Sequence, residues 1–155
     1  MALALDVDGL KHALGRWDVD PSASGLHARR LSIALAREQL SAGYEVIVGQ
    51  YLARTSFIEE LERMAGQQGA RFLEFVLDID PPALAARLAQ RSRDPDRAEH
   101  EVNSRLVAPG DADRLVESIE ALRAVRPHAI WIDARGSQAC TLNLLRTALR
   151  APENR

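Results

Sequence analysis

The chain has 155 residues, a net charge of −2 and 46% hydrophobic residues, a composition that fits a globular protein with a sizeable core. A charge this close to zero excludes the broad basic field that wraps nucleic acid. No apolar run approaches the roughly 20 residues that span a bilayer, so a membrane protein is not expected. Cys140 is the single cysteine, which rules out an internal disulfide and predicts a cytoplasmic protein.

The first half of the sequence alternates strand and helix patterns. The expected elements are a strand over residues 2–6, a short helix over 10–15, a long helix over 25–42, a strand over 44–49 and a helix over about 56–65. Gly43 is placed to end the long helix. Leu31, Ile33 and Leu35 predict its apolar face. Ser56 and Glu59 have the spacing of a capping box for the last of these helices.

The second half repeats the pattern. The expected elements are a strand over residues 70–79 and helices over 82–91 and 112–125, then a strand over 128–133 and a helix over 138–150. Asp80 and Pro81 predict the cap and the first turn of the helix over 82–91. Residues 92–111 are polar and arginine-rich and show no clear pattern, and residues 151–155 form a tail.

This alternation of apolar strands and helices predicts an α/β fold. We expect one domain over residues 1–150, with a parallel sheet between two helical layers as a three-layer α/β/α sandwich. Ligands in such sheets bind at the carboxyl ends of the strands. The polar residues expected near those ends are Asp6, Asp8, Gly49, Gln50, Asp78, Asp80 and Asp133.

The motif Asp6-Val7-Asp8-Gly9 allows two interpretations. An Asp-x-Asp-Gly after a strand opens the active site of haloacid-dehalogenase-type phosphohydrolases, which would use Asp6 and Asp8 here, with Asp6 as the nucleophile. The further motifs of that class are not matched, because the strand over 44–49 lacks a terminal Ser or Thr and Asp133 has no acidic neighbour. This phosphohydrolase is therefore the alternative prediction.

The order and spacing of the segments "LALDVDGLKHAL", "LAREQLSAGYEVIVGQYLAR", "FLEFVLDIDPPALAARLAQR" and "IWIDARGS" resemble another class. They are similar to P-loop small-molecule kinases of the shikimate/gluconate-kinase-like and chloramphenicol-phosphotransferase-like branch, including bacterial proteins labelled "AAA family ATPase". The resemblance covers nearly the full length. It implies ATP-dependent phosphotransfer to a hydroxyl of a small molecule, with ATP and Mg²⁺ as cofactors.

The resemblance also implies roles for individual residues. Catalysis would fall to Asp8, Arg87 and Arg91, substrate binding to Asp6, Asp8, Gln50 and Arg54, nucleotide binding to Arg91, Arg93, Arg135 and Gly136, and metal binding to Asp6. Arginine suits phosphoryl transfer because its planar guanidinium pairs with two oxygens at once. An arginine-bearing lid is expected over about 91–111.

The phosphate-binding loop of such kinases, Gly-x-x-x-x-Gly-Lys-Ser/Thr, does not occur in this sequence, which has no Gly-Lys pair. The resemblance places the sequence from the second strand of the kinase fold onward, with the first strand and the P-loop absent. We therefore expect this chain to turn over ATP poorly. A degenerate, non-catalytic nucleotide- or ligand-binding domain is a further alternative.

Overall fold

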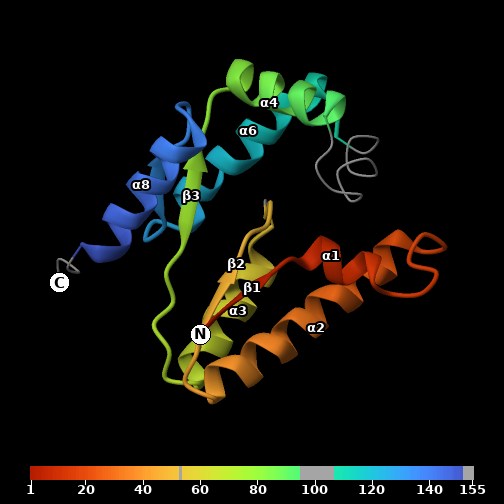
Figure 1. Ribbon diagram of the computed structural model, residues 1–155, viewed down its shortest axis with the longest axis vertical. Helices are drawn as coiled ribbons and strands as arrows, with labels where there is room; N and C mark the ends of the chain where they lie inside the picture. The colour runs from red at the N-terminus through yellow and green to blue at the C-terminus, as the bar shows by residue number, and fades with distance from the viewer. Residues whose placement is uncertain (53, 95–106, 152–155) are drawn as a thin grey trace. The chain divides into compact units, whose positions relative to one another are not determined.

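The computed structural model describes residues 1–52, 54–94 and 107–151 (Figure 1). The chain divides into two compact units, Met1–Phe72 and Leu73–Arg155. Most of the lid that the sequence predicts over 91–111, and residues 152–155 of the predicted tail, lie outside the described residues. The prediction of one domain over 1–150 stays a prediction.

The first unit contains a parallel two-stranded sheet and three helices. Its elements are β1 (Ala2–Leu5), α1 (Val7–His12), α2 (Pro21–Ser41), β2 (Glu45–Val48) and α3 (Thr55–Gln67). Strands β1 and β2 pair in parallel, with Leu3 opposite Val46 and Leu5 opposite Val48. The parallel pairing that the strand–helix alternation predicts is thus confirmed for these two strands.

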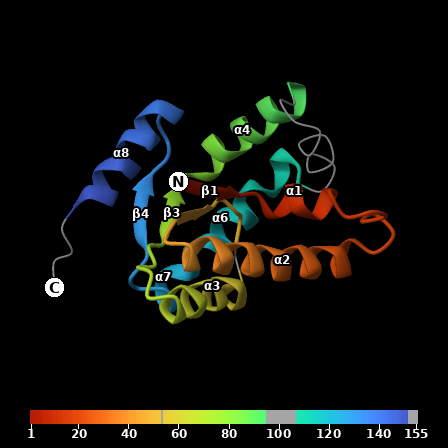
Figure 2. The same cartoon turned by 60° about the horizontal axis from the view of Figure 1, so that its bottom comes forward.

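Helices α2 and α3 lie side by side in this unit (Figures 1 and 2). Their buried side chains share one core with Leu5 of β1, and Phe57, Leu61 and Met64 of α3 are the largest members. Burying a side chain of this size contributes roughly 1.5–3 kcal/mol, so this core is the main source of the unit's stability. The opposite sheet face is open, because Ile47 is 62% exposed.

The ends of the helices in this unit differ from the sequence predictions. Helix α2 begins at Pro21, four residues early, because the Asp20 carboxylate accepts hydrogen bonds from the Ser22 and Ala23 N–H groups at 3.1 and 2.9 Å. Helix α3 begins at Thr55 without a side-chain cap. The capping box at residues 56 and 59 is therefore wrong, because residue 56 already lies inside the first turn.

The buried face of α2 includes the predicted Ile33 but otherwise consists of smaller residues than the sequence predicted. Ala28, Ser32 and Ala36 are buried at four-residue spacing, whereas Leu35 is 43% exposed. The Ser32 hydroxyl donates to the Ala28 carbonyl at 2.9 Å, which satisfies the hydroxyl without a partner from another element. Gly43 ends the helix with φ +78°, a conformation that glycine adopts without strain, as predicted.

The second unit holds another parallel pair of strands. Its elements are β3 (Phe75–Asp78), α4 (Pro81–Arg93), η1 (Pro109–Asp111), α6 (Ala112–Glu120), α7 (Leu122–Val125), β4 (Ile130–Asp133) and α8 (Gln138–Arg150). Val76 pairs with Trp131 and Asp78 with Asp133. Helix α8 lies beside β4 (Figure 2). The predicted helix over 112–125 is interrupted at one residue, Ala121, which separates α6 from α7.

Two arginines of the second unit pack against its strands. The Arg126 guanidinium donates to the Glu74 carboxylate at 2.9 Å through Nε, in an ion pair whose side chains are 15% and 13% exposed. The guanidinium carbon of Arg123 lies 3.4 Å from the centroid of the Trp131 ring, and its Nη2 donates to Asp78 at 3.3 Å. The Trp131 ring is half-buried beneath this arginine.

The structure is thus a mixed α/β protein with parallel strands in each unit. This confirms the α/β class and the parallel pairing that the sequence predicts. Among the helices in the described residues, none combines the length and the apolar character required to cross a membrane.

Candidate functional site

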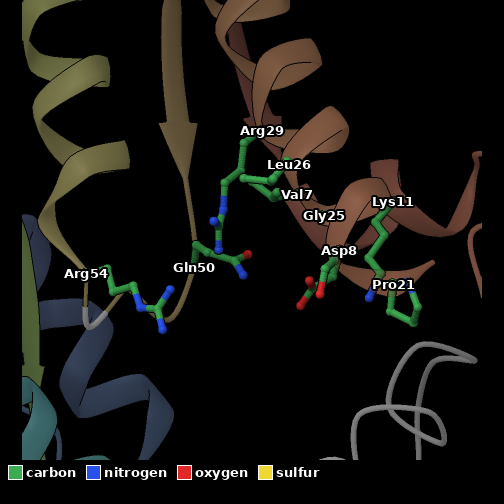
Figure 3. Close-up of a pocket in the computed structure, with 10 residues that line it drawn as sticks. Val7, Asp8, Lys11, Pro21, Gly25, Leu26, Arg29, Gln50 and Arg54 are labelled. Carbon is green, nitrogen blue, oxygen red and sulfur yellow. The ribbon is translucent and has the colours of Figure 1, made fainter.

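A cavity of about 360 Å³ lies in the first unit, next to the carboxyl ends of β1 and β2 (Figure 3). It is bounded by the start of α1, one face of α2 and the segment between β2 and α3. The lining residues are Val7, Asp8, Lys11, Pro21, Ser22, Gly25, Leu26, Arg29, Gln50 and Arg54. The cavity is therefore at the end of the strands where a parallel sheet is expected to place its ligand.

The first turn of α1 separates the two carboxylates of the Asp-x-Asp motif. Asp6 is the N-cap of this helix and accepts a hydrogen bond from the Gly9 N–H at 3.0 Å. A Cβ atom at Gly9 would lie 3.3 Å from Cγ of Asp6, so glycine lets the capping carboxylate approach closely. Asp8 and Lys11, three residues apart on one helical face, line the cavity instead.

Helix α2 contributes the longest wall of the cavity. Pro21, Gly25 and Arg29 are spaced by four residues and share one face of this helix. The Asp20 cap starts the helix at Pro21, so this face includes all three residues. The Arg29 guanidinium carbon lies 5.9 Å from the ring centroid of Phe57, a core residue of α3. The exposed guanidinium of Arg29 is thus held near the cavity by a contact with the core.

Gln50 and Arg54 complete the site from the segment after β2. Gln50 is half-buried and Arg54 is exposed at the N-terminus of α3. Figure 3 shows the polar ends of Asp8, Arg29, Gln50 and Arg54 turned toward the same space. The cavity therefore offers a carboxylate that accepts hydrogen bonds, an amide that donates and accepts, and guanidinium groups that donate.

The charges around the cavity are unbalanced. Lys11, Arg29 and Arg54 face a single carboxylate, that of Asp8. Within the described residues, none of these four side chains takes part in an ion pair or a hydrogen bond, although Lys11 Nζ lies 5.0 Å from the centroid of the Trp17 ring. Cationic groups that converge without protein partners favour an anionic ligand.

The second unit uses its arginines differently. The Arg87 guanidinium donates through Nη2 to the carbonyls of Ala134 and, at 2.8 Å, of Gly136, so it ties α4 to the segment between β4 and α8. Arg93 donates to the Ala89 carbonyl within its own helix at 3.2 Å. These bonds occupy two arginines to which the sequence resemblance gave catalytic or nucleotide-binding roles.

Arg91 and Arg135, the other predicted nucleotide-binding arginines, also lie in this unit. The Nε atom of Arg91 is buried and has no hydrogen-bond partner among the described residues. Arg135 donates to the Asp133 carboxylate through Nε at 2.9 Å and through Nη2 at 2.8 Å. These hydrogen bonds stabilise the charged carboxylate and lower the pKa of Asp133 from 3.8 to about 2.

The cavity brings together three of the predicted site residues and adds others. Asp8, Gln50 and Arg54 line it, whereas Asp6 caps α1 and does not. Lys11 and Arg29 also line the cavity, although neither is among the predicted site residues. The signal was present for Arg29, because Pro21, Gly25 and Arg29 have the four-residue spacing of one helical face, but the helix start at Asp20 had to be recognised first.

The part of the chain that the structure describes contains no group of three or more His, Cys, Asp or Glu side chains placed to hold a metal ion. Comparisons of the chain with protein-family models, with curated proteins and with solved structures give no match. The function is therefore argued from the geometry of the cavity and the chemistry of its residues.

Proposed function

We propose that this chain is a phosphotransferase-like protein whose first-unit cavity binds a small molecule through a hydroxyl group. The observation that carries the proposal is the convergence of Asp8, Gln50 and Arg54 on one cavity at the carboxyl ends of β1 and β2. The sequence resemblance implies substrate binding by the same three residues. A volume of about 360 Å³ suits a compact metabolite.

In this proposal Asp8 accepts a hydrogen bond from the substrate hydroxyl and takes its proton. The hydroxyl oxygen then bonds to the γ-phosphorus of a nucleoside triphosphate, the bond from that phosphorus to the bridging oxygen breaks, and the nucleoside diphosphate leaves. Gln50 and the cationic side chains orient the substrate. A general base contributes typically 10²–10⁴-fold to the rate, which sets the effect expected from removing the Asp8 carboxylate.

The sequence has no Gly-x-x-x-x-Gly-Lys-Ser/Thr loop, and Asp6, the candidate for Mg²⁺, caps α1 through one carboxylate oxygen. The described donors thus do not match a protein-built metal centre, and no step is derived through one. The proposal therefore includes slow ATP turnover by this chain.

We extend the proposal to the finer fold, a three-layer α/β/α sandwich like that of P-loop kinases. The parallel pairing within each unit supports it.

The test measures transfer of radiolabel from γ-labelled ATP, with magnesium, to a panel of hydroxyl-bearing metabolites. We expect slow transfer by the wild type and at least a 100-fold loss in Asp8→Asn, by the general-base magnitude above. Asp18→Asn is the matched control, because Asp18 is exposed in the segment after α1 and does not line the cavity.

Two results would overturn the proposal. One is transfer that is equal in Asp8→Asn and Asp18→Asn, since Asp8 would then have no chemical role. The other is hydrolysis of an aryl phosphate that depends on Asp6, because this result would assign the chain to the phosphohydrolase alternative.

A further inference from the structure

We infer that the small molecule in the first-unit cavity is a phosphomonoester that also carries a free hydroxyl. This inference rests on the proposed function, because it names the class of substrate that the same cavity takes. Its basis is the set of three cationic side chains, Lys11, Arg29 and Arg54, that surround the cavity together with one carboxylate, Asp8.

The charge of the cavity matches a dianion. Three positive side chains and one negative side chain leave an excess of two positive charges. A phosphomonoester carries about −1.5 to −2 charges at pH 7, because its second pKa is about 6. A carboxylic acid brings only one negative charge, and a neutral alcohol brings none, so neither neutralises the cavity.

The cations also come from three different elements, which suits the shape of a phosphate. Lys11 lies on α1, Arg29 on α2 and Arg54 at the start of α3. A phosphate group presents three oxygens in different directions, and each guanidinium can donate two parallel hydrogen bonds to it. Asp8 would repel the phosphate, so the uncharged hydroxyl end of the ligand is the part that lies next to it.

Carboxylate pairing distinguishes three arginines of the second unit from the cations of the cavity. In the second unit Arg123, Arg126 and Arg135 are all held by carboxylates. Across the described residues, Arg29 and Arg54 have no carboxylate partner, so their guanidinium groups can pair with an anionic ligand. A structural role as surface ion pairs does not account for them.

Binding is measured in the absence of ATP, so that the result does not depend on phosphoryl transfer. Isothermal titration of the wild-type chain compares glycerol phosphate and ribose phosphate with glycerol, ribose, ribonate and inorganic phosphate. Trp17 gives a second readout in Trp131→Phe, because its ring lies 5.0 Å from Nζ of Lys11. We expect at least one phosphomonoester to bind about tenfold or more tightly than its parent sugar or alcohol and than ribonate.

Variants test which side chains give this preference. Arg29→Gln and Arg54→Gln should each remove most of it, whereas Arg30→Gln should keep it, because Arg30 is exposed on the same helix and does not line the cavity. The affinity for the phosphomonoester should also rise between about pH 5 and pH 7, because the phosphate group loses its second proton over this range.

Three results would overturn the inference. They are equal binding of phosphomonoesters and their parents, equal or tighter binding of ribonate, and inorganic phosphate that binds as tightly as the esters, since the rest of the ligand would then add nothing. Phosphomonoester binding without any ATP-dependent transfer would keep this inference and reject the proposed transfer. Transfer to an uncharged alcohol without phosphomonoester binding would do the reverse.

Discussion

Replacement of Arg87 by methionine removes the two hydrogen bonds that join α4 to the segment between β4 and α8. In the wild type the guanidinium donates to the carbonyls of Ala134 and Gly136. Methionine keeps most of the aliphatic stem, so the change isolates the loss of the charged donor. This variant tests whether Arg87 acts in stability, as its contacts indicate, rather than on a nucleotide.

The expected loss of stability follows from the surroundings of the two bonds. Hydrogen bonds to charged groups contribute about 1.5–3 kcal/mol when they are shielded from water, and exposed ones contribute far less. The bond to Ala134 is partly buried and the bond to Gly136 is exposed. We therefore expect the free energy of unfolding to fall by about 2 kcal/mol, or about 4–8 °C in Tm for a chain of this size.

Urea denaturation followed by Trp131 fluorescence in a Trp17→Phe background measures the effect, because Trp131 lies in β4 of the same unit. The midpoint should fall while the slope of the free energy against urea stays constant. Arg146→Met is the control, since Arg146 is exposed on α8. An equal, small shift in Arg87→Met and Arg146→Met would refute the reasoning and return Arg87 to the candidates for nucleotide binding.

Three further predictions concern other polar contacts. Glu74→Gln should lower the free energy of unfolding by about 2–3 kcal/mol in urea denaturation, because it leaves the charge of Arg126 unpaired on a side chain that is only 15% exposed. The control is Glu60→Gln, whose partner Arg63 is 61% exposed, and it should lower the free energy of unfolding by less than about 0.5 kcal/mol. Asp20→Ala removes the cap of α2 and should cost about 1 kcal/mol in thermal unfolding followed by circular dichroism. Arg135→Met should raise the pKa of Asp133 from about 2 toward 3.8 in a carboxyl NMR titration. Because folding lowers this pKa, the pair stabilises the fold above about pH 4, and the difference between wild type and variant should vanish as the pH falls through 2.

Local signals in the sequence predicted the elements that depend on few neighbours. The predicted helix over 138–150 has the bounds of α8, and the Ser137 side chain caps this helix by accepting from the Cys140 N–H at 3.2 Å. Asp80 before Pro81 was recognised as a helix start, and the Asp80 carboxylate accepts from the Ala83 N–H at 2.9 Å. The prediction did not use the same Asp-Pro signal at residues 20 and 21. The predicted start of α2 is therefore four residues late, and the prediction misses the α2 wall of the cavity.

Long-range contacts could not be predicted in this way. Arg87 meets its carbonyl acceptors 47 and 49 residues further along the chain, and no local pattern marks which arginines meet such partners. The sequence resemblance placed both Asp6 and Asp8 at the substrate, but the cap geometry of α1 sends only Asp8 to the cavity. Asp8 and Gln50 both lie near strand ends, which gather at one edge of a parallel sheet, and the cavity adds Arg54 from the start of α3. Their role in substrate binding stays a prediction from the sequence resemblance.

The lysine content of the chain gives the cavity a chemical handle. Lys11 is the only lysine among 155 residues, and it lines the cavity. Reductive methylation with isotope-labelled formaldehyde would keep its positive charge and introduce one side-chain methyl signal, apart from that of the terminal amine. A single NMR resonance would then report from inside the cavity, so that compound libraries could be screened without assigning the spectrum of the protein.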